Sequence, residues 1–208
     1  MFPKSTELPN KFIAKEKFYS HGEFIGKIKA SMTEDVSKIT AINQFSSKTL
    51  NIEAGQVFPE IMVLNVVLKN KTFNEKILDA MDKSVRSSYV LFILQFNNQQ
   101  AASIAFKDKN ADNITITKRW TTPWTNNLDL QIEGRSIDGV YENLIKQISG
   151  GKLVSKTDKP LKTKVLDTIE QEKIMKKIAQ HENKMDNEPQ LKKKLAIKAD
   201  IKALKEQL

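Results

Sequence analysis

Residues 89–96 read YVLFILQF and contain an uninterrupted apolar run at 90–94. A run of this length between polar residues is typical of a central strand that is covered on both faces. The polar residues 97–100, NNQQ, predict a turn that reverses the chain into a second strand over 101–107. Residues 61–68, IMVLNVVL, are also almost continuously apolar and predict another buried strand.

Two further stretches alternate apolar and polar residues with a period of two. They cover 113–120 and 128–133, and this period predicts half-buried antiparallel strands. A short extended piece is expected at 49–52. The sheet of this protein should therefore be mixed and mostly antiparallel.

Other stretches have the spacing of helices. Apolar residues at spacings of four and three predict a helix over 28–42. Thr72 and Glu75 fit a capping box that would begin a second helix, whose inner face carries Ile77 and Met81. A third helix is expected over 136–148, with Gly150 at its C-terminal end. With an N-terminal arm over 1–27 that docks on it, this α+β body should span residues 1–150.

The chain beyond Pro160 is rich in helix-forming residues. Two helical stretches, 161–186 and 190–207, are separated by a break that contains Pro189. In the second stretch, Ile197, Ile201 and Leu204 follow the seam spacing of a coiled coil. We therefore expect a mixed α+β fold followed by a coiled-coil-like antiparallel hairpin, with residues 151–208 as a basic helical tail.

Charge and composition exclude several classes of protein. The 208 residues carry 34 Lys and Arg against 25 Asp and Glu, a net charge of +9, and no cysteine. Without cysteine there is no disulfide, thiol nucleophile or Cys-ligated zinc. Residues 152–208 hold 15 Lys against 9 acidic residues, so 15 − 9 = +6 of the net charge lies in the tail. No apolar run approaches the ~20 residues that a membrane helix needs, and we expect a cytoplasmic protein.

Motifs for catalysis are not visible in the sequence. The segment 22–28 is one residue too short for a phosphate-binding loop, and there is no G-x-G-x-x-G. The two histidines, His21 and His181, are expected to be surface residues. The Glu-x-Lys and Asp-x-Lys patterns of restriction-type nucleases occur only at 182–184 and 200–202, in the helical tail, where ordinary charge patterning explains them. We predict no catalytic residue, no metal ligand and no cofactor.

Two groups of residues are candidates for binding. Trp120 and Trp124 flank a proline-containing turn, and Arg119 and Trp124 suit a protein interface. The alternative is that Trp120 caps the core at the end of a strand and that Trp124 holds the loop in place. The predicted partner-binding set also includes the hairpin residues Ile197, Ile201 and Leu204. A predicted nucleic-acid-binding set is formed by lysines of the tail, and the alternative is a solvated helix face: Lys192, Lys193, Lys194, Lys198 and Lys202.

Several short motifs resemble a bacterial and archaeal family catalogued as a domain of unknown function. The matching stretches are PKST at 3–6, KFIAKEKFY at 11–19, LFILQF at 91–96, the Thr-x-x-Trp turn at 121–124, YENLIKQI at 141–148 and LKKKLAIKADIKALKEQL at 191–208. What the resemblance implies is a context: genes beside a helicase and a DNA methyltransferase, in restriction-like or phage-defence clusters. It carries over no catalytic residue.

These observations leave three hypotheses for function. The leading one is a non-enzymatic accessory subunit of a bacterial anti-phage defence or restriction-like complex, which binds a helicase or nuclease partner and touches DNA or RNA through its lysines. The alternative is a divergent metal-dependent nuclease whose carboxylates, for example Glu53, Glu60 and Asp79, converge in space. The third is a nucleic-acid-binding module that acts alone.

Overall fold

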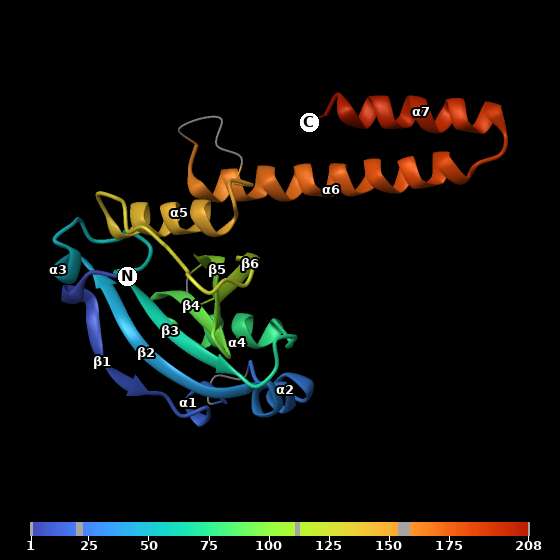
Figure 1. Cartoon of the computed structure of the whole chain (residues 1–208). Coiled ribbons are helices and arrows are strands. Elements are labelled where there is room, and N and C mark those ends of the chain that lie inside the picture. The colour runs from blue at the N-terminus through green and yellow to red at the C-terminus, as the bar shows by residue number, and fades with distance from the viewer. Residues whose placement is uncertain (1, 20–22, 111–112, 154–158, 208) are drawn as a thin grey trace. The chain divides into compact units, whose positions relative to one another are not determined.

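The fold is described from a computed structural model of the chain (Figure 1), which describes residues 2–19, 23–110, 113–153 and 159–207. The chain divides into two compact units, Met1–Gly151 and Lys152–Leu208. The first unit is a mixed sheet packed with helices and the second is a helical hairpin, so the expected fold class is confirmed. Within the described residues, no helix combines the length and the apolar character that crossing a bilayer requires.

The first unit is built on a six-stranded sheet whose strand order follows the sequence. Among the strands of the described residues, β3 and β4 pair in parallel and the other four pairs are antiparallel. The strands expected at 61–68, 89–96, 101–107 and 113–120 are confirmed. The six strands are β1 (Glu7–Phe12), β2 (Val36–Ser46), β3 (Glu60–Leu68), β4 (Tyr89–Phe96), β5 (Gln99–Asn110) and β6 (Asn113–Thr121).

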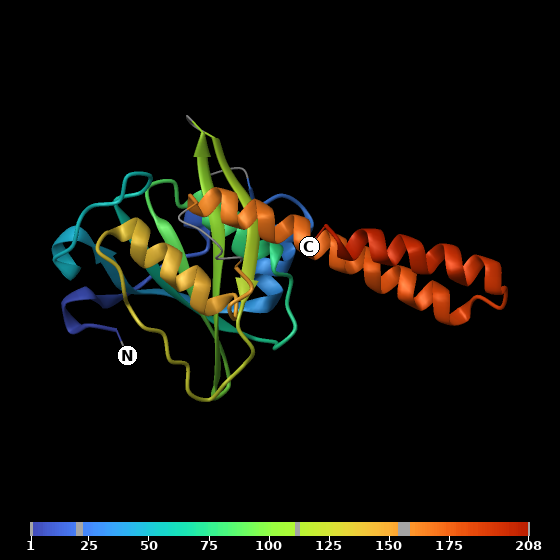
Figure 2. The same cartoon turned by 90° about the horizontal axis from the view of Figure 1, so that it is seen from above.

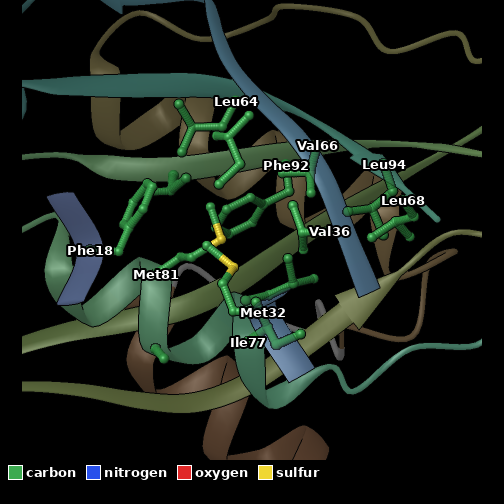
Figure 3. Close-up of a cluster of buried hydrophobic side chains, with 14 of the residues drawn as sticks. Phe18, Met32, Val36, Leu64, Val66, Leu68, Ile77, Met81, Phe92 and Leu94 are labelled. Atoms are coloured by element: carbon green, nitrogen blue, oxygen red, sulfur yellow. The ribbon is translucent and has the colours of Figure 1, made fainter. Parts of the chain in front are cut away.

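One face of the sheet is covered by the helix that connects β3 to β4. A parallel pair of strands needs such a crossover, and here it is α4 (Lys76–Ser84). Next to α4 lie α2 (Lys27–Asp35) and α1 (Glu16–Tyr19). Figure 3 shows Met32, Met81 and Phe92 meeting between these helices and the sheet, all fully buried.

The opposite face is covered by α5 (Ile137–Ile148), which packs on β5 and also contacts β3 and β6. Figure 2 shows this helix lying across β5. Ser136 caps its start by accepting a hydrogen bond from the Gly139 amide at 3.1 Å. Gly150 follows its end with a φ of +64°, which a glycine adopts without strain.

Two expectations near the start of the body are wrong. The helix expected over 28–42 ends at Asp35, because Val36–Ser46 forms β2 between β1 and β3. Two bulges in β2, between Val36 and Lys38 and between Ala41 and Asn43, break its alternation and imitate helical spacing. Residues 49–52 are not extended either, since α3 (Ser47–Leu50) is a helical turn with a capping box between Ser46 and Thr49.

Two further expectations are wrong later in the chain. The Thr72–Glu75 capping box is absent: α4 begins at Lys76, whose amide donates to Asn74 Oδ1 at 3.2 Å. Residues 128–133 form no strand. Instead of a strand neighbour, Gln131 bonds the side chain of Gln147 on α5, with its amide donating to Gln147 Oε1 at 2.9 Å.

The second unit consists of α6 (Leu161–Asn187) and α7 (Leu191–Lys205). The two helices run antiparallel beside each other and are joined across Glu188–Gln190 (Figure 1). Glu188 Oε1 accepts the Gln190 amide at 2.9 Å, which helps to hold the tight connection around Pro189. The predicted hairpin is therefore confirmed.

Candidate functional site

The seam between α6 and α7 uses three of the residues predicted to bind a partner. Ile201 is 6% exposed and packs with Ile174 and Ile178 of α6. Ile197 and Leu204 are half-buried and pack against the same cluster. The coiled-coil spacing of α7 therefore serves contact inside the hairpin, and the apolar surface available to a partner lies elsewhere.

A second apolar stripe lies on the outside of α7. Leu191 is 72% exposed and Leu195 is 58% exposed. Lys198 and Lys202 continue from Leu195 at spacings of three and four, so these four residues share one helix face. We call this set, Leu191, Leu195, Lys198 and Lys202, the outer stripe.

The outer stripe borders a shallow depression on α7. Its lining residues are Leu195, Lys198, Ala199, Ile201, Lys202, Lys205 and Glu206. Lys205 bonds Glu182 of α6 at 3.1 Å, an exposed ion pair that bridges the two helices. The depression therefore has an apolar floor with lysines on its rim.

The five lysines predicted to bind nucleic acid do not share one face. Lys198 and Lys202 belong to the outer stripe and are exposed. Lys194 is half-buried, while Lys192 and Lys193 are exposed. At about 100° per residue, Lys193 points away from the outer stripe, whereas Lys192 lies about 60° from Leu195 at the edge of the stripe. Of the five, Lys198 and Lys202 therefore continue the line of the exposed leucines.

In the body, Arg119 is held inside a network of charges between β6 and α4. Its side chain is only 7% exposed. Nε donates to Asp79 Oδ1 at 2.7 Å and Nη2 donates to Asp82 Oδ2 at 2.7 Å. The guanidinium lies 5.2 Å from the centre of the Phe92 ring. Arg119, predicted to bind a partner, is thus engaged by groups of its own chain.

Lys107 of β5 completes this network from the other side. Its ammonium donates to the carbonyl oxygens of Asp82 and Ser88, each at 2.7 Å, and to that of Val85. The ammonium also lies 3.7 Å from Asp82 Oδ1, and both side chains are 1% exposed. Three acceptors match the three hydrogens of an ammonium, so Lys107 ties the end of α4 and the following loop to the sheet.

Burial changes the pKa of both charged partners. Loss of water raises the pKa of Asp82, and the charges of Arg119 and Lys107 oppose this rise. Burial lowers the pKa of Lys107 to about 8, with the Asp82 carboxylate opposing that change. Lys107 therefore keeps its proton at neutral pH.

Two stacked tyrosines lie under α5. The rings of Tyr89 and Tyr141 are 3.6 Å apart and nearly parallel. Tyr89 donates to Asp138 Oδ1 at 2.9 Å, while Tyr141 donates to the Ala105 carbonyl and accepts the Lys107 amide at 2.9 Å. Burial raises the pKa of both phenols, so they remain protonated donors: Tyr89 fixes β4 to α5, and Tyr141 fixes α5 to β5.

Trp124, the other body residue predicted to bind a partner, is half-buried against the main core. The ammonium of Lys71 lies 5.9 Å from its ring centre. Trp120 is 6% exposed, and its Nε1 has no hydrogen-bond partner among the described residues. Much of the tryptophan surface therefore packs inside the body.

Residues considered for metal binding are dispersed. Glu60 accepts bonds from Ser88 and Gln44, Asp79 pairs with Arg119, and Glu53 is an exposed residue that pairs with Ser136 through its backbone. Among the described residues, no three His, Asp or Glu side chains are grouped to hold a metal ion. His181 lies on α6, and His21 lies outside the described residues.

The sequence did not single out Asp82 or Lys107. Asp82 follows Leu78 by four residues, so it lies on the apolar face of α4, where a charged residue needs a buried partner. Lys107 follows Ala105 and Phe106 within a strand, where a bulge after Phe106 turns its side chain inward. The position of Asp82 on an apolar helix face is the sequence feature from which a buried charge could have been predicted.

The structure thus defines an α+β body with helices on both faces of its sheet, followed by a helical hairpin with an exposed apolar and basic stripe. The family model described as "Domain of unknown function (DUF4391)" matches residues 1–208, and the chain belongs to this family. The expected membership in a family of unknown function is confirmed. Comparison with curated proteins and with solved structures gives no match.

Proposed function

We propose that this protein is a non-enzymatic accessory subunit that binds a protein partner through the outer stripe of its hairpin. The observation that carries the proposal is the exposure of Leu191 and Leu195 while the seam of the same helix is already filled. Leucines exposed at a spacing of four on a helix form a ready face for packing into an apolar groove.

The positive charge around the outer stripe restricts the chemistry of the partner. Residues 152–208 carry a net charge of +6 (15 − 9), and Lys198 and Lys202 continue the line of Leu191 and Leu195. A second copy of the same hairpin would bring like charges together, which opposes association. The stripe fits a partner whose apolar groove is edged by Asp and Glu.

We further propose that the partner is a helicase or nuclease subunit of a bacterial anti-phage defence or restriction-like complex in the cytoplasm. Support comes from the resemblance to a family that implies this genetic context. The engagement of Arg119, Asp82 and Lys107 inside the body also fits a scaffold rather than a reactive centre. DNA or RNA held by the same complex would meet Lys198 and Lys202.

The test is binding of the purified full chain to the helicase and nuclease products of the genes beside its own. Leu195→Glu places a charge in the outer stripe, whereas Ala196→Glu adds the same charge at the next exposed position of α7. We expect Leu195→Glu to weaken a complex measured by calorimetry at least about tenfold, since one interface leucine is replaced by a desolvated charge.

Ala196→Glu should retain most of the affinity. Circular dichroism of both variants shows whether the hairpin remains helical. The proposal fails if the full chain binds none of these products, or if the two substitutions weaken a complex equally.

A further inference from the structure

A loop between β6 and α5 forms a strap across one face of the sheet. We define the strap as residues 125–131. At one end, the Gln100 amide donates to the Thr125 carbonyl at 2.7 Å and the Thr125 amide donates to the Gln100 carbonyl at 2.9 Å. At the other end, Gln147 Nε2 of α5 donates to the Gln131 carbonyl at 2.8 Å. The strap is therefore fixed at both ends and spans the surface between them.

A pocket of about 380 Å³ lies beside the strap, a size in the range of small-molecule sites. Its walls come from the strap, from the strands β1, β2, β4 and β5, and from the N-terminal arm. The lining residues are Phe2, Glu7, Ile42, Asn43, Ile93, Gln100, Asn127, Leu128 and Leu130.

The polar groups of this pocket are amides and one carboxylate. Asn43 is 6% exposed, and its Nδ2 donates to Thr6 Oγ1 at 2.8 Å, which fixes the orientation of the amide. Glu7 lies opposite Asn43 in the pairing of β1 with β2. In the part of the chain that the structure describes, the side chains of Glu7, Gln100 and Asn127 make no hydrogen bond to another residue. These groups are available to a ligand.

The apolar part of the lining suits a flat ring. Ile93 and Leu130 are buried, and Leu128 is half-buried. Aliphatic side chains pack against the faces of a ring and leave its edges to the amides. The pocket therefore combines apolar side chains with hydrogen-bonding groups.

The charge of the lining restricts the ligand further. No Lys, Arg or His is among the lining residues, and Glu7 adds a negative charge. An anionic group such as a phosphate would therefore be disfavoured inside the pocket. Amide side chains offer a donor and an acceptor side by side, which matches the paired edge groups of a nucleobase, and a carboxylate accepts from an exocyclic amino group.

We propose that this pocket binds a nucleobase, as a free base or nucleoside without phosphate in the pocket. The proposal rests on the body alone and does not depend on the outer stripe of the hairpin. It adds a small-molecule or single-base recognition site to a protein whose other candidate surface suits a protein partner.

The test is calorimetric titration of the full chain with adenosine, guanosine, cytidine and uridine, and with the matching 5′-monophosphates. Asn127→Leu removes one pocket amide, and Asn126→Leu is the matched control at an exposed position of the strap that does not line the pocket. Both positions are exposed, so neither substitution should disturb folding. Two-dimensional NMR of the labelled protein locates the binding site.

We expect at least one nucleoside to bind, its monophosphate to bind more weakly, and Asn127→Leu to weaken binding about tenfold through a lost hydrogen bond. Asn126→Leu should bind as the natural chain does. Ligand-induced NMR shifts should include Gln100 and Asn43. The proposal is overturned if no nucleoside binds at millimolar concentration, if the monophosphates bind more tightly, or if the two Asn variants behave alike.

Discussion

Three charged residues lock α4 of the body to β5 and β6. Asp82 accepts from Arg119, and Lys107 donates to three carbonyl groups at the end of α4 and in the loop that follows it. Burying such charges costs desolvation energy, so the network is weak support for stability in itself. Its loss would be costly, because removing one partner leaves another charge buried without compensation.

Replacement of Arg119 by Met should show this cost. With Asp82 left without its guanidinium partner, we expect the free energy of unfolding to fall by about 3–5 kcal/mol at pH 7. Burial already raises the pKa of Asp82 above its ordinary 3.8, and loss of Arg119 removes a charge that opposes the rise. As the pH falls through this raised pKa, the folded carboxyl takes up a proton, so the deficit of the variant should shrink.

Urea unfolding of the Arg119→Met variant between pH 7 and pH 4 is the measurement. Asp79→Asn is the control, because Asp79 is 39% exposed and its pairing with Arg119 should contribute only about 1 kcal/mol or less. A deficit that stays constant with pH would contradict the role given to Asp82.

The free energy of unfolding should also depend on pH through Lys107. Its pKa is lowered by burial from 10.5 to about 8. Between these values the unfolded chain holds the proton and the folded chain releases it, so the free energy of unfolding should rise with pH. Tyr89 and Tyr141 act in the opposite sense above pH 10, because burial raises their pKa and the folded chain keeps their protons.

The two tyrosines do not contribute between pH 8 and pH 10, where urea unfolding at several pH values measures the slope; burial also lowers the pKa of Lys15, which adds a rise of the same sign. Carbon-13 NMR of lysine side chains reports the titration of Lys107 directly. The rise should be smaller in Lys107→Met, where only the contribution of Lys15 is left. A flat profile for the natural chain, or a Lys107 signal that titrates near 10.5, would refute the prediction.

At the scale of elements, the sequence predicts those strands and helices whose side chains are buried in a regular pattern. Residues 89–96 and 61–68 are almost continuously apolar because β3 and β4 lie in the middle of a sheet covered by helices on both faces. The hairpin helices are also predictable, since their stripes match the helical repeat. In these segments, the order of buried and exposed residues follows the repeat of the strand or helix itself.

The failures occur where tertiary contacts override local pattern. Bulges in β2 gave its apolar residues helical spacing, and β2 forms because strands on both sides pair with it. The stretch 128–133 alternates like a strand, yet Gln147 of α5 holds it as a strap. The pocket beside the strap was equally invisible, because its residues come from segments that only the fold brings together.

The two apolar faces of α7 should respond differently to truncation. Ile201 is buried in the seam, so Ile201→Ala should destabilise the hairpin by about 2–5 kcal/mol. Leu195 is largely exposed, and Leu195→Ala should change stability by less than about 0.5 kcal/mol. Hydrogen exchange of residues 161–187 and 191–205 measures both effects. Equal loss of protection in the two variants would contradict the assignment of the seam.

At the scale of the whole molecule, the net charge of +9 is unevenly distributed. Residues 152–208 carry +6 of it (15 − 9), so the other 151 residues carry only +3 (9 − 6). A concentration of lysine on one unit creates a local field that draws in anionic partners without a contact specific for any sequence. Whether one face of the hairpin binds anionic partners more strongly than another depends on how its lysines are arranged. The lysines of the outer stripe allow this to be tested.

Nucleic-acid binding through the outer stripe should depend on position and not on net charge alone. Lys198→Glu and Lys193→Glu change the net charge equally, but only the first alters the stripe. For fluorescence anisotropy with a labelled DNA duplex at several salt concentrations, we expect Lys198→Glu to lower the slope of log affinity against log salt by about 1 for a lost phosphate contact. Lys193→Glu should lower the affinity less and leave the slope nearly unchanged, because Lys193 points away from the stripe. Equal weakening by both substitutions would mean that the duplex responds to total charge, and absence of binding at low salt would remove DNA as a ligand of this face.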